Sequence, residues 1–328
     1  MNKTWLGIGC GVAAGAFWGL VFLAPELARE FTPLQLAAGR YLAYGLFAAL
    51  LVVPRWRTLS GTIGGREWWA LAWLSLLGNI LYYVLLASAV QLGGMAMTSL
   101  VIGFLPVAVT IIGSRDHDAV PFRKLLPSLL LGAAGILCIG WQSLGGGGTG
   151  LRVAEVTGLL CAVGALISWT TYAVSNSRWL ARLHHVSAHD WSLLTGLVTG
   201  AQALLLAIPA FVAGPLLMGG DSHDGGEWLH FVAVASGVAI LASIVGNALW
   251  NRMSRLLPLT LVGQMILFET LFALLYGFLW EQRLPTVIEC AAIAFVIGSV
   301  LASASAHRPK PSIPNSEASD AEGKPVSA

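Results

Sequence analysis

The chain has 328 residues and a net charge of +2; 56% of the residues are hydrophobic and only 10% are charged. Soluble domains average about 25% charged residues. A single water-soluble core cannot bury this much apolar surface, whereas a lipid bilayer can. The composition therefore predicts an all-α integral membrane protein, and no nucleic-acid partner is expected.

Ten apolar segments follow one another along the chain. A hydrocarbon core of about 30 Å requires about 20 apolar residues for each helical crossing, and all ten segments approach this length. We predict ten transmembrane helices with these approximate bounds: Trp5–Ala24, Leu34–Val53, Trp68–Val90, Met95–Gly113, Leu125–Gln142, Ala154–Val174, Trp191–Val212, Trp228–Asn251, Leu259–Leu279 and Thr286–Ser305.

Basic residues near the ends of these segments predict the orientation, because cytoplasmic loops carry an excess of Lys and Arg. Alternate loops differ sharply in their number of Lys and Arg residues. The loops of one set hold only Arg29, Arg152 and Arg283. The loops of the other set, together with the two termini, hold Lys3, Arg55, Arg57, Arg66, Arg115, Arg123, Lys124, Arg178, Arg182, Arg252, Arg255, Arg308 and Lys310. We therefore predict a multi-pass protein of a bacterial-type inner membrane, with both termini in the cytoplasm.

The two halves of the chain echo each other. A Gly-Asn-x-Leu-aromatic string at residues 78–82, near the end of the third segment, returns at residues 246–250 in the eighth. Five crossings bring the chain to the opposite face, so a second five-helix unit starts inverted. Inverted repeats of this kind give many secondary transporters their fold. We predict a first repeat at residues 1–145, an inverted second repeat at 151–306 and a disordered cytoplasmic tail at 307–328.

This pattern resembles the drug/metabolite transporter superfamily, specifically its ten-helix EamA-type permeases, over residues 5–305. The family usually carries a small residue and a Trp in the first helix of each half, which Trp18 and Trp169 match. It often carries Pro in the fourth helix of each half. Pro106 fits this pattern, but Glu269 stands at the comparable place in the second half.

A narrower resemblance concerns residues 164–176, followed later by Trp250 and Asn251. This combination of small, aromatic and amide residues is similar to the aromatic amino-acid exporter branch of the same superfamily. The resemblance implies a transmembrane permease that moves small metabolites, with amino-acid transport as one expectation.

Glu269 is the sharpest candidate for a functional group. It lies near the middle of the ninth predicted segment, where a carboxylate costs about 2.5–3.5 kcal/mol or more unless it is neutralised or faces a wet cavity. A carboxyl group that gains and loses a proton with the access state could couple export to proton entry. The alternative is a Glu that only bonds a neighbouring helix.

Arg40 lies in the first two turns of the second segment. Its planar fork could hold a substrate carboxylate. It could equally extend its head group to the outer surface of the membrane, or pair with Glu26 or Glu30 across the short outer loop. All three roles remain open at this stage.

Amides and tyrosines within the segments are candidates for the wall of a central cavity. An amide in hydrocarbon requires partners, so the same groups could instead join helices. These candidates are Asn79, Tyr82, Tyr83, Asn247 and Asn251.

Tryptophans divide into two groups by depth. Trp18, Trp169 and Trp250, with Tyr172, could wall an apolar substrate pocket or simply pack. Five others suit the belts of aromatic residues at the membrane surfaces, namely Trp68, Trp69, Trp191, Trp228 and Trp280.

Four glycines recur every four residues on the first segment, at Gly7, Gly11, Gly15 and Gly19. Such a ridge allows close approach of helices, within the bundle or across a homodimer, so either a monomer or a homodimer is open. We assign the ridge and Pro106 to helix packing.

Two other features are assigned no chemistry. The glycine run at 145–148 matches a nucleotide-binding pattern in letters only, since no strand precedes it, and we interpret it as a joint between the halves. His184, His185 and His189 form a solvated basic loop, so no metal and no cofactor are expected.

We therefore predict a secondary active transporter that exports small amphipathic metabolites such as amino acids or drugs by alternating access, with the proton as a candidate coupling ion. A facilitative channel and an intramembrane enzyme are the alternatives. The chain carries no H-E-x-x-H, G-x-S-x-G or G-x-x-x-x-G-K-[ST] string, so we expect neither an enzyme nor an ATP-driven motor.

Overall fold

The computed structural model describes residues 3–113, 122–145, 153–183, 186–213, 223–256 and 265–306. Within these ranges the chain is helical and contains no strand, so the predicted all-α class is confirmed. The tail at 307–328, most of the glycine run, and His184 and His185 fall outside the described residues.

Helices of the first half follow the predicted segments closely. Gly65–Gly93 forms one continuous helix that comprises α4, η2 and α5. The bounds are α1 Lys3–Leu27, α2 Pro33–Val52, η1 Val53–Arg55, α3 Trp56–Thr62, α4 Gly65–Ser75, η2 Leu76–Leu81, α5 Tyr82–Gly93, α6 Met95–Ile102, α7 Leu105–Gly113 and α8 Phe122–Gly145.

The second half also combines long helices with interrupted ones. The bounds are α9 Val153–Arg182, α10 Ala188–Ile208, η3 Pro209–Ala213, α12 Gly225–Val238, η4 Ala239–Gly246, α13 Asn247–Leu256, α15 Leu267–Trp280 and α16 Val287–Ala306.

Six helices of the described chain are long and apolar enough to cross a bilayer. Four shorter apolar helices lie at Met95–Val109, Leu126–Gly135, Leu267–Trp280 and Val287–Ala302. Helical structure thus occurs in all ten predicted segments. The full set of ten crossings stays a prediction, because these four are shorter than about 20 residues.

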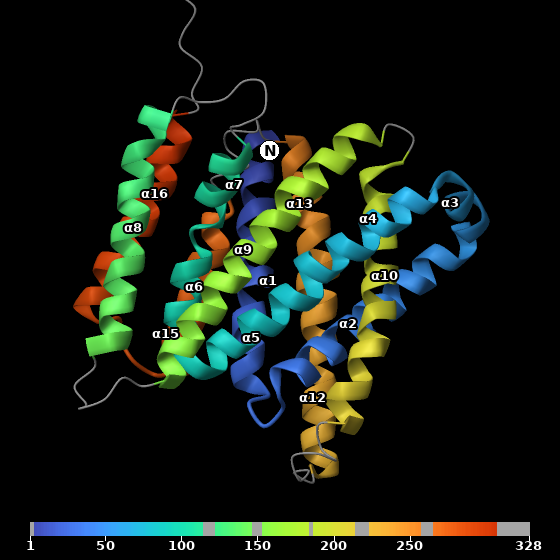
Figure 1. The fold of residues 1–328 in the computed structure, drawn as a ribbon, viewed down its shortest axis with the longest axis horizontal. Coiled ribbons are helices and arrows are strands. Elements are labelled where there is room, and N and C mark those ends of the chain that lie inside the picture. The colour runs from blue at the N-terminus through green and yellow to red at the C-terminus, as the bar shows by residue number, and fades with distance from the viewer. Residues whose placement is uncertain are drawn as a thin grey trace, which may run out of the picture.

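Helices from the two halves interleave in the bundle (Figure 1). The most extensive packing joins α2 to α10, α8 to α16, α5 to α9 and α1 to α15. Each of these pairs takes one helix from each half. The pair α8 and α16 stands at one end of the molecule, whereas α1 lies in its middle.

Both Gly-Asn strings lie at π-helical turns. The first string starts inside η2, and the second spans the junction of η4 with α13. A π-helical turn disrupts the regular ladder of backbone hydrogen bonds and often marks a functional site. The sequence analysis did not anticipate these turns.

The fourth predicted segment is broken, contrary to the prediction of one helix over Met95–Gly113. A turn at Gly103 and Phe104 separates α6 from α7. Pro106 follows this turn as the second residue of α7, and proline cannot donate the backbone hydrogen bond that would continue α6. Its ring therefore explains why the helix ends before it.

The glycine ridge of α1 faces the second half of the same chain. A Cβ on Gly15 would lie 2.7 Å from Cβ of Phe268 and 2.9 Å from the backbone nitrogen of Glu269. A Cβ on Gly19 would lie 3.0 Å from the backbone nitrogen of Ala273. The backbones of α1 and α15 approach closely because these positions lack side chains.

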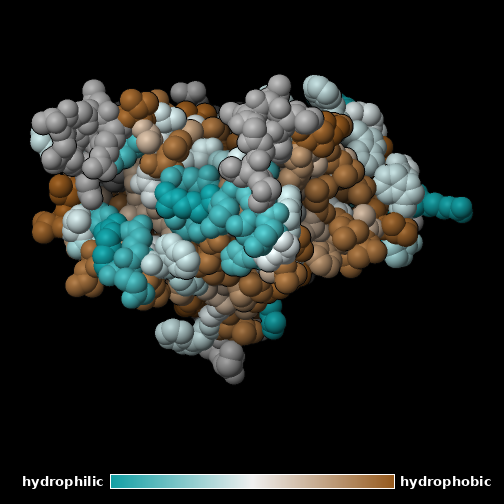
Figure 2. All heavy atoms as spheres, turned by 90° about the horizontal axis from the view of Figure 1, so that it is seen from below, coloured by the Kyte–Doolittle hydropathy of each residue, from teal (hydrophilic) through white to brown (hydrophobic). Residues whose placement is uncertain are grey.

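Charged residues join several helices at the end of the bundle where α1 ends and α16 begins. Arg29 pairs with Glu26 at 3.0 Å and donates to the backbone oxygen of Gln91 at 3.1 Å. Arg283 forms a bidentate pair with Glu289, with both distances 2.7 Å. Figure 2 looks onto this end and shows hydrophilic residues gathered in its middle.

Candidate functional site

A cavity of about 460 Å³ lies between the two halves. Helices α1, α2, α5 and α7 of the first half and α9, α10, α13 and α15 of the second contribute to its wall, together with η2 and η4. The residues predicted from the sequence that line it are Trp18, Arg40, Asn79, Tyr82, Trp169, Tyr172, Asn247, Trp250 and Glu269.

Among the predicted residues whose side chains the structure describes, Tyr83 is not a lining residue. Tyr83 is buried with 1% of its surface exposed and packs against the guanidinium of Arg40. It does not line the cavity, because it points from α5 toward α2, and its part in substrate binding stays a prediction. The side chain of Asn251 lies outside the described part of the structure.

Several polar and aromatic residues line the cavity without having been predicted from the sequence. Serine and threonine give no hydropathy signal, and three tyrosine and amide side chains lie on faces that only the packing of helices identifies. The clearest sequence signal for these residues was adjacency to a predicted residue, as for Tyr41, which is next to Arg40. The missed residues are Tyr41, Tyr44, Asn176, Trp191, Ser192, Thr195 and Ser243.

Trp191 corrects the prediction of an aromatic belt. It is 2% exposed, lines the cavity, and its indole Nε1 donates to Oδ1 of Asn176 at 2.8 Å. By contrast, Trp69 is 74% exposed, as a belt residue would be. Trp191 is near a helix start in the sequence, but it is buried in a cluster with Leu71 and Leu74 of α4.

Trp18 and Trp250 form one aromatic wall. Their ring centroids are 4.9 Å apart, and the indole Nε1 of Trp18 donates to the backbone oxygen of Ala242 at 3.1 Å. The Trp18 ring fills the space beside Gly246, where a Cβ would lie 2.8 Å from Nε1. This contact joins α1 to η4.

The corresponding contact on the other side uses Tyr172. Its ring fills the space beside Gly78 of η2, where a Cβ would lie 2.4 Å from the ring carbons. Trp169 packs edge-on against Tyr172 with centroids 6.0 Å apart. Each Gly-Asn string therefore receives an aromatic ring from the opposite half of the chain.

Amides supply polar groups between these walls. Asn79 donates through Nδ2 to Oγ1 of Thr199 at 2.9 Å, which joins η2 to α10. Asn247 donates through Nδ2 to the backbone oxygen of Ser243 at 2.8 Å, within its own helix. Both amides line the cavity and also have structural partners, so both roles assigned from the sequence are physically available.

Arg40 is 7% exposed and lines the cavity. Its nearest hydrogen-bond partner is Oγ of Ser243, at 3.4 Å from Nη2. Within the described residues it pairs with no carboxylate, and Glu26 pairs with Arg29 instead. The alternatives of an outer pair with Glu26 and of a head group at the membrane surface are therefore not seen.

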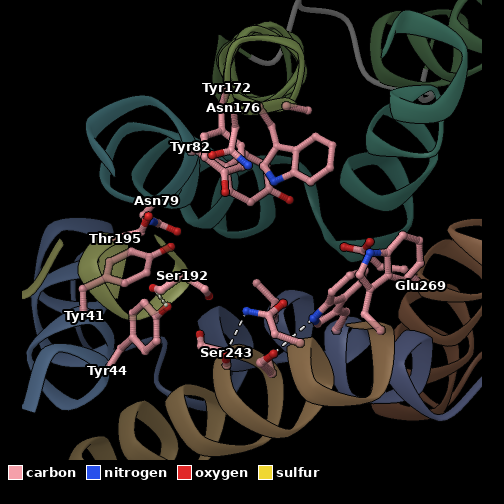
Figure 3. Close-up of a pocket in the computed structure, with 18 of the residues that line it drawn as sticks. Tyr41, Tyr44, Asn79, Tyr82, Tyr172, Asn176, Ser192, Thr195, Ser243 and Glu269 are labelled. Atoms are coloured by element: carbon pink, nitrogen blue, oxygen red, sulfur yellow. Dashed lines mark hydrogen bonds between the residues drawn. The ribbon is translucent and has the colours of Figure 1, made fainter. Parts of the chain in front are cut away.

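Glu269 lies in the first turn of α15, directly after a turn at Ile266. Met265 before this turn is also helical, and residues 257–264 lie outside the described structure, so the place of Glu269 near the middle of the ninth segment stays a prediction. Figure 3 shows Glu269 across the cavity from Tyr41 and Tyr44, and the charge of Arg40 attracts its carboxylate.

Aromatic side chains close the bundle near the start of α12. Phe31 stacks on His223 with centroids 4.2 Å apart and on Phe231 at 4.4 Å. His230 lies with Nε2 2.8 Å from the backbone oxygen of Leu27. None of these side chains lines the cavity.

No group of three or more His, Cys, Asp or Glu side chains that could hold a metal occurs among the described residues. His184 and His185 are outside those residues, so the prediction for their loop is not tested.

The fold and the cavity define a polytopic helical membrane protein with a cavity of the size of a small molecule. The EamA-like transporter family matches residues 5–141. Inner membrane protein YtfF of Escherichia coli (strain K12) is 32% identical over 315 residues, which cover 93% of this chain and 97% of that protein. The chain belongs to the EamA-like transporter family, as the resemblance to EamA-type permeases predicted, and it is a transmembrane transporter.

A crystal structure of a protein of unstated function has a similar fold. Its TM-score is 0.58 at 20% identity, and the match covers 92% of this chain and 96% of the other. At this identity the likeness concerns the fold alone. It extends over both halves of the chain, beyond the region that the family matches.

Proposed function

We propose that this protein is a secondary active transporter of the inner membrane that exports small amphipathic metabolites by alternating access. The cavity between the two halves is the observation that carries the proposal. Its volume falls within the range of about 300–1,000 Å³ typical of small-molecule sites, and its wall combines aromatic rings with a few polar groups.

The packing of helices supports two inverted five-helix repeats. In two such repeats, the first to fifth predicted segments correspond to the sixth to tenth, and a two-fold rotation exchanges the halves. This rotation maps the contact of α1 with α13 onto the contact of α9 with α5. It also maps α1 with α15 onto α9 with α6 and α7, and α2 with α12 onto α10 with α4. Each pair of contacts is present, while α2 with α10 and α8 with α16 map onto themselves.

The position of the cavity supports alternating access. Its lining residues include Trp18 of α1, Tyr82 at the start of α5, Asn176 late in α9 and Trp191 early in α10. The end of α9 carries Arg178 and Arg182, two of the basic residues that predict the cytoplasmic side. The cavity therefore extends toward the proposed cytoplasmic side. The aromatic contacts of Phe31 and the charged network of Arg29 lie at the other end. We infer that this is an inward-facing state.

Glu269 is the proposed coupling group. It shares the cavity with the aromatic walls and with the charge of Arg40. A carboxyl group in this place can exchange its proton with whichever side the cavity faces. Proton release on one side and uptake on the other would then drive export of the substrate.

Counterflow in proteoliposomes tests the proposal. Vesicles loaded with unlabelled L-phenylalanine, L-tryptophan or 3-phenylpropionate would be diluted into a trace of the same labelled compound. A carrier accumulates label transiently because internal substrate returns the site to the outside, and at least one compound should show this overshoot. Label that equilibrates without an overshoot would indicate a channel and contradict alternating access.

A further inference from the structure

Arg40 has hydrogen-bonding capacity that the fold does not use. Its guanidinium is buried, with 7% of the residue exposed, and Nε and Nη1 have no hydrogen-bond partner. Nη2 makes one long bond of 3.4 Å to Ser243. Leaving a buried donor unsatisfied costs about 1–3 kcal/mol, and more when the donor is charged.

Two tyrosines hold this guanidinium in place. Its central carbon lies 4.4 Å from the ring centroid of Tyr83 and 5.1 Å from that of Tyr41. The two rings meet edge to face at 5.9 Å, and both residues are almost fully buried. Aromatic faces attract a cation but accept none of its in-plane N–H bonds. The platform therefore fixes the position of Arg40 and leaves Nε and Nη1 without a hydrogen-bond partner.

The surroundings do not neutralise Arg40 by direct contact. Glu269 attracts it electrostatically from elsewhere in the cavity wall, but the two side chains form no direct ion pair. A buried cation requires a counter-charge or hydrogen-bond acceptors to offset its desolvation. An oxyanion that entered the cavity would supply both.

We propose that the cavity binds a small organic oxyanion, with its carboxylate or phosphate on Arg40 and its apolar body between the aromatic walls of Trp18 and Tyr172. A planar guanidinium matches both head groups with paired hydrogen bonds. That this ligand is the transported substrate rests on the proposed function. The binding site itself does not depend on it.

Isothermal titration calorimetry of the purified full chain in detergent tests the site with three probes of similar size. These are 3-phenylpropionate, its neutral analogue 3-phenylpropanamide, and phenyl phosphate. Hydrogen bonds to charged groups contribute about 1.5–3 kcal/mol, so an oxyanion should bind at least about tenfold more tightly than the amide. Comparison of the two oxyanions shows which head group the site prefers.

Variants locate the site on Arg40. Arg40→Gln should abolish the preference for the oxyanion. Arg57→Gln, which removes an exposed charge in α3, should keep it. Tyr83→Phe should bind like the native protein because the ring face is retained, and Tyr83→Leu should bind the oxyanion several-fold more weakly. Melting temperatures verify that each variant is folded.

The proposal is overturned if the native protein binds the amide as tightly as both oxyanions, or binds neither oxyanion. It is also overturned if folded Arg40→Gln retains the preference. The comparison of probes on the native protein requires no variant, so a misfolded Arg40→Gln does not prevent a decision. Oxyanion binding without counterflow would contradict the proposed transport and leave this site in place.

Discussion

The indole Nε1 of Trp18 in α1 donates a hydrogen bond of 3.1 Å to the backbone oxygen of Ala242, inside the π-helical turn η4. The same indole occupies the space beside Gly246. A π-helical turn disrupts the regular backbone ladder, and here a side chain from the other half bonds to one of its carbonyl groups. Trp18 therefore connects the two halves at the cavity wall.

Gly246→Ala should break this connection. The new Cβ would lie 2.8 Å from Nε1 of Trp18, so the indole must move away from Ala242. Overpacking of this kind costs about 1–3 kcal/mol. We expect a lower melting temperature in detergent and loss of transport.

Gly237→Ala is the matched control, because a Cβ at Gly237 in α12 meets nothing within 4 Å. Alanine is favoured over glycine within a helix by about 0.5–1 kcal/mol, so this variant should be unchanged or slightly more stable. Equal melting temperatures for the two variants would contradict the proposed contact.

Gly15→Leu should block folding or transport. The side chain would enter the contact with Phe268 and the backbone of Glu269, where even a Cβ comes within 2.7 Å. Gly9→Leu, on the same helix, is the control because a Cβ there meets nothing within 4 Å. Expression, melting temperature and counterflow compare the two variants. Normal transport by Gly15→Leu would contradict a close contact of α1 with α15.

Chemical labelling can determine the orientation that the basic residues predict. In a background without native cysteines, Leu284→Cys, at a position 86% exposed, should react with a membrane-impermeant maleimide in intact cells. Arg57→Cys should react only after the membrane is permeabilised. The opposite pattern would invert the proposed topology, and with it the direction in which the cavity extends.

The helical class could be predicted because its signal is local, and so could nine of the 22 residues that line the cavity. A charged or amide side chain inside an apolar segment, such as Glu269 or Asn247, requires a polar environment wherever the helix packs. Trp18 and Trp169 stood at equivalent places in the two halves, which linked them before any contact was known. Composition and repetition were therefore sufficient for these residues.

Other features depend on how helices meet, and the sequence does not encode them locally. Ser192 and Thr195 face the cavity only because α10 packs on α2 and η2, and Trp191 is buried in a cluster with residues of α4. Likewise, nothing in the apolar composition of η2 separates a π-helical turn from an α-helical one. Tyr82 lines the cavity and Tyr83 does not, since adjacent residues of a helix point about 100° apart.

The coupling role of Glu269 makes a prediction that separates two activities. The group lies in the first turn of α15 and lines the cavity, so a neutral amide of the same shape should keep the wall intact while removing the exchangeable proton. Exchange of substrate for substrate requires only the wall. Transport driven by a pH gradient requires the proton.

Glu269→Gln should therefore lose accumulation driven by a pH gradient and retain counterflow. Both are measured in the same proteoliposomes, with and without an imposed gradient, using whichever probe shows counterflow with the native protein. Glu30→Gln, which changes an exposed carboxylate in the outer loop, should retain both activities. Undiminished gradient-driven accumulation by Glu269→Gln would remove this residue from coupling, because an amide cannot carry a proton between the two access states.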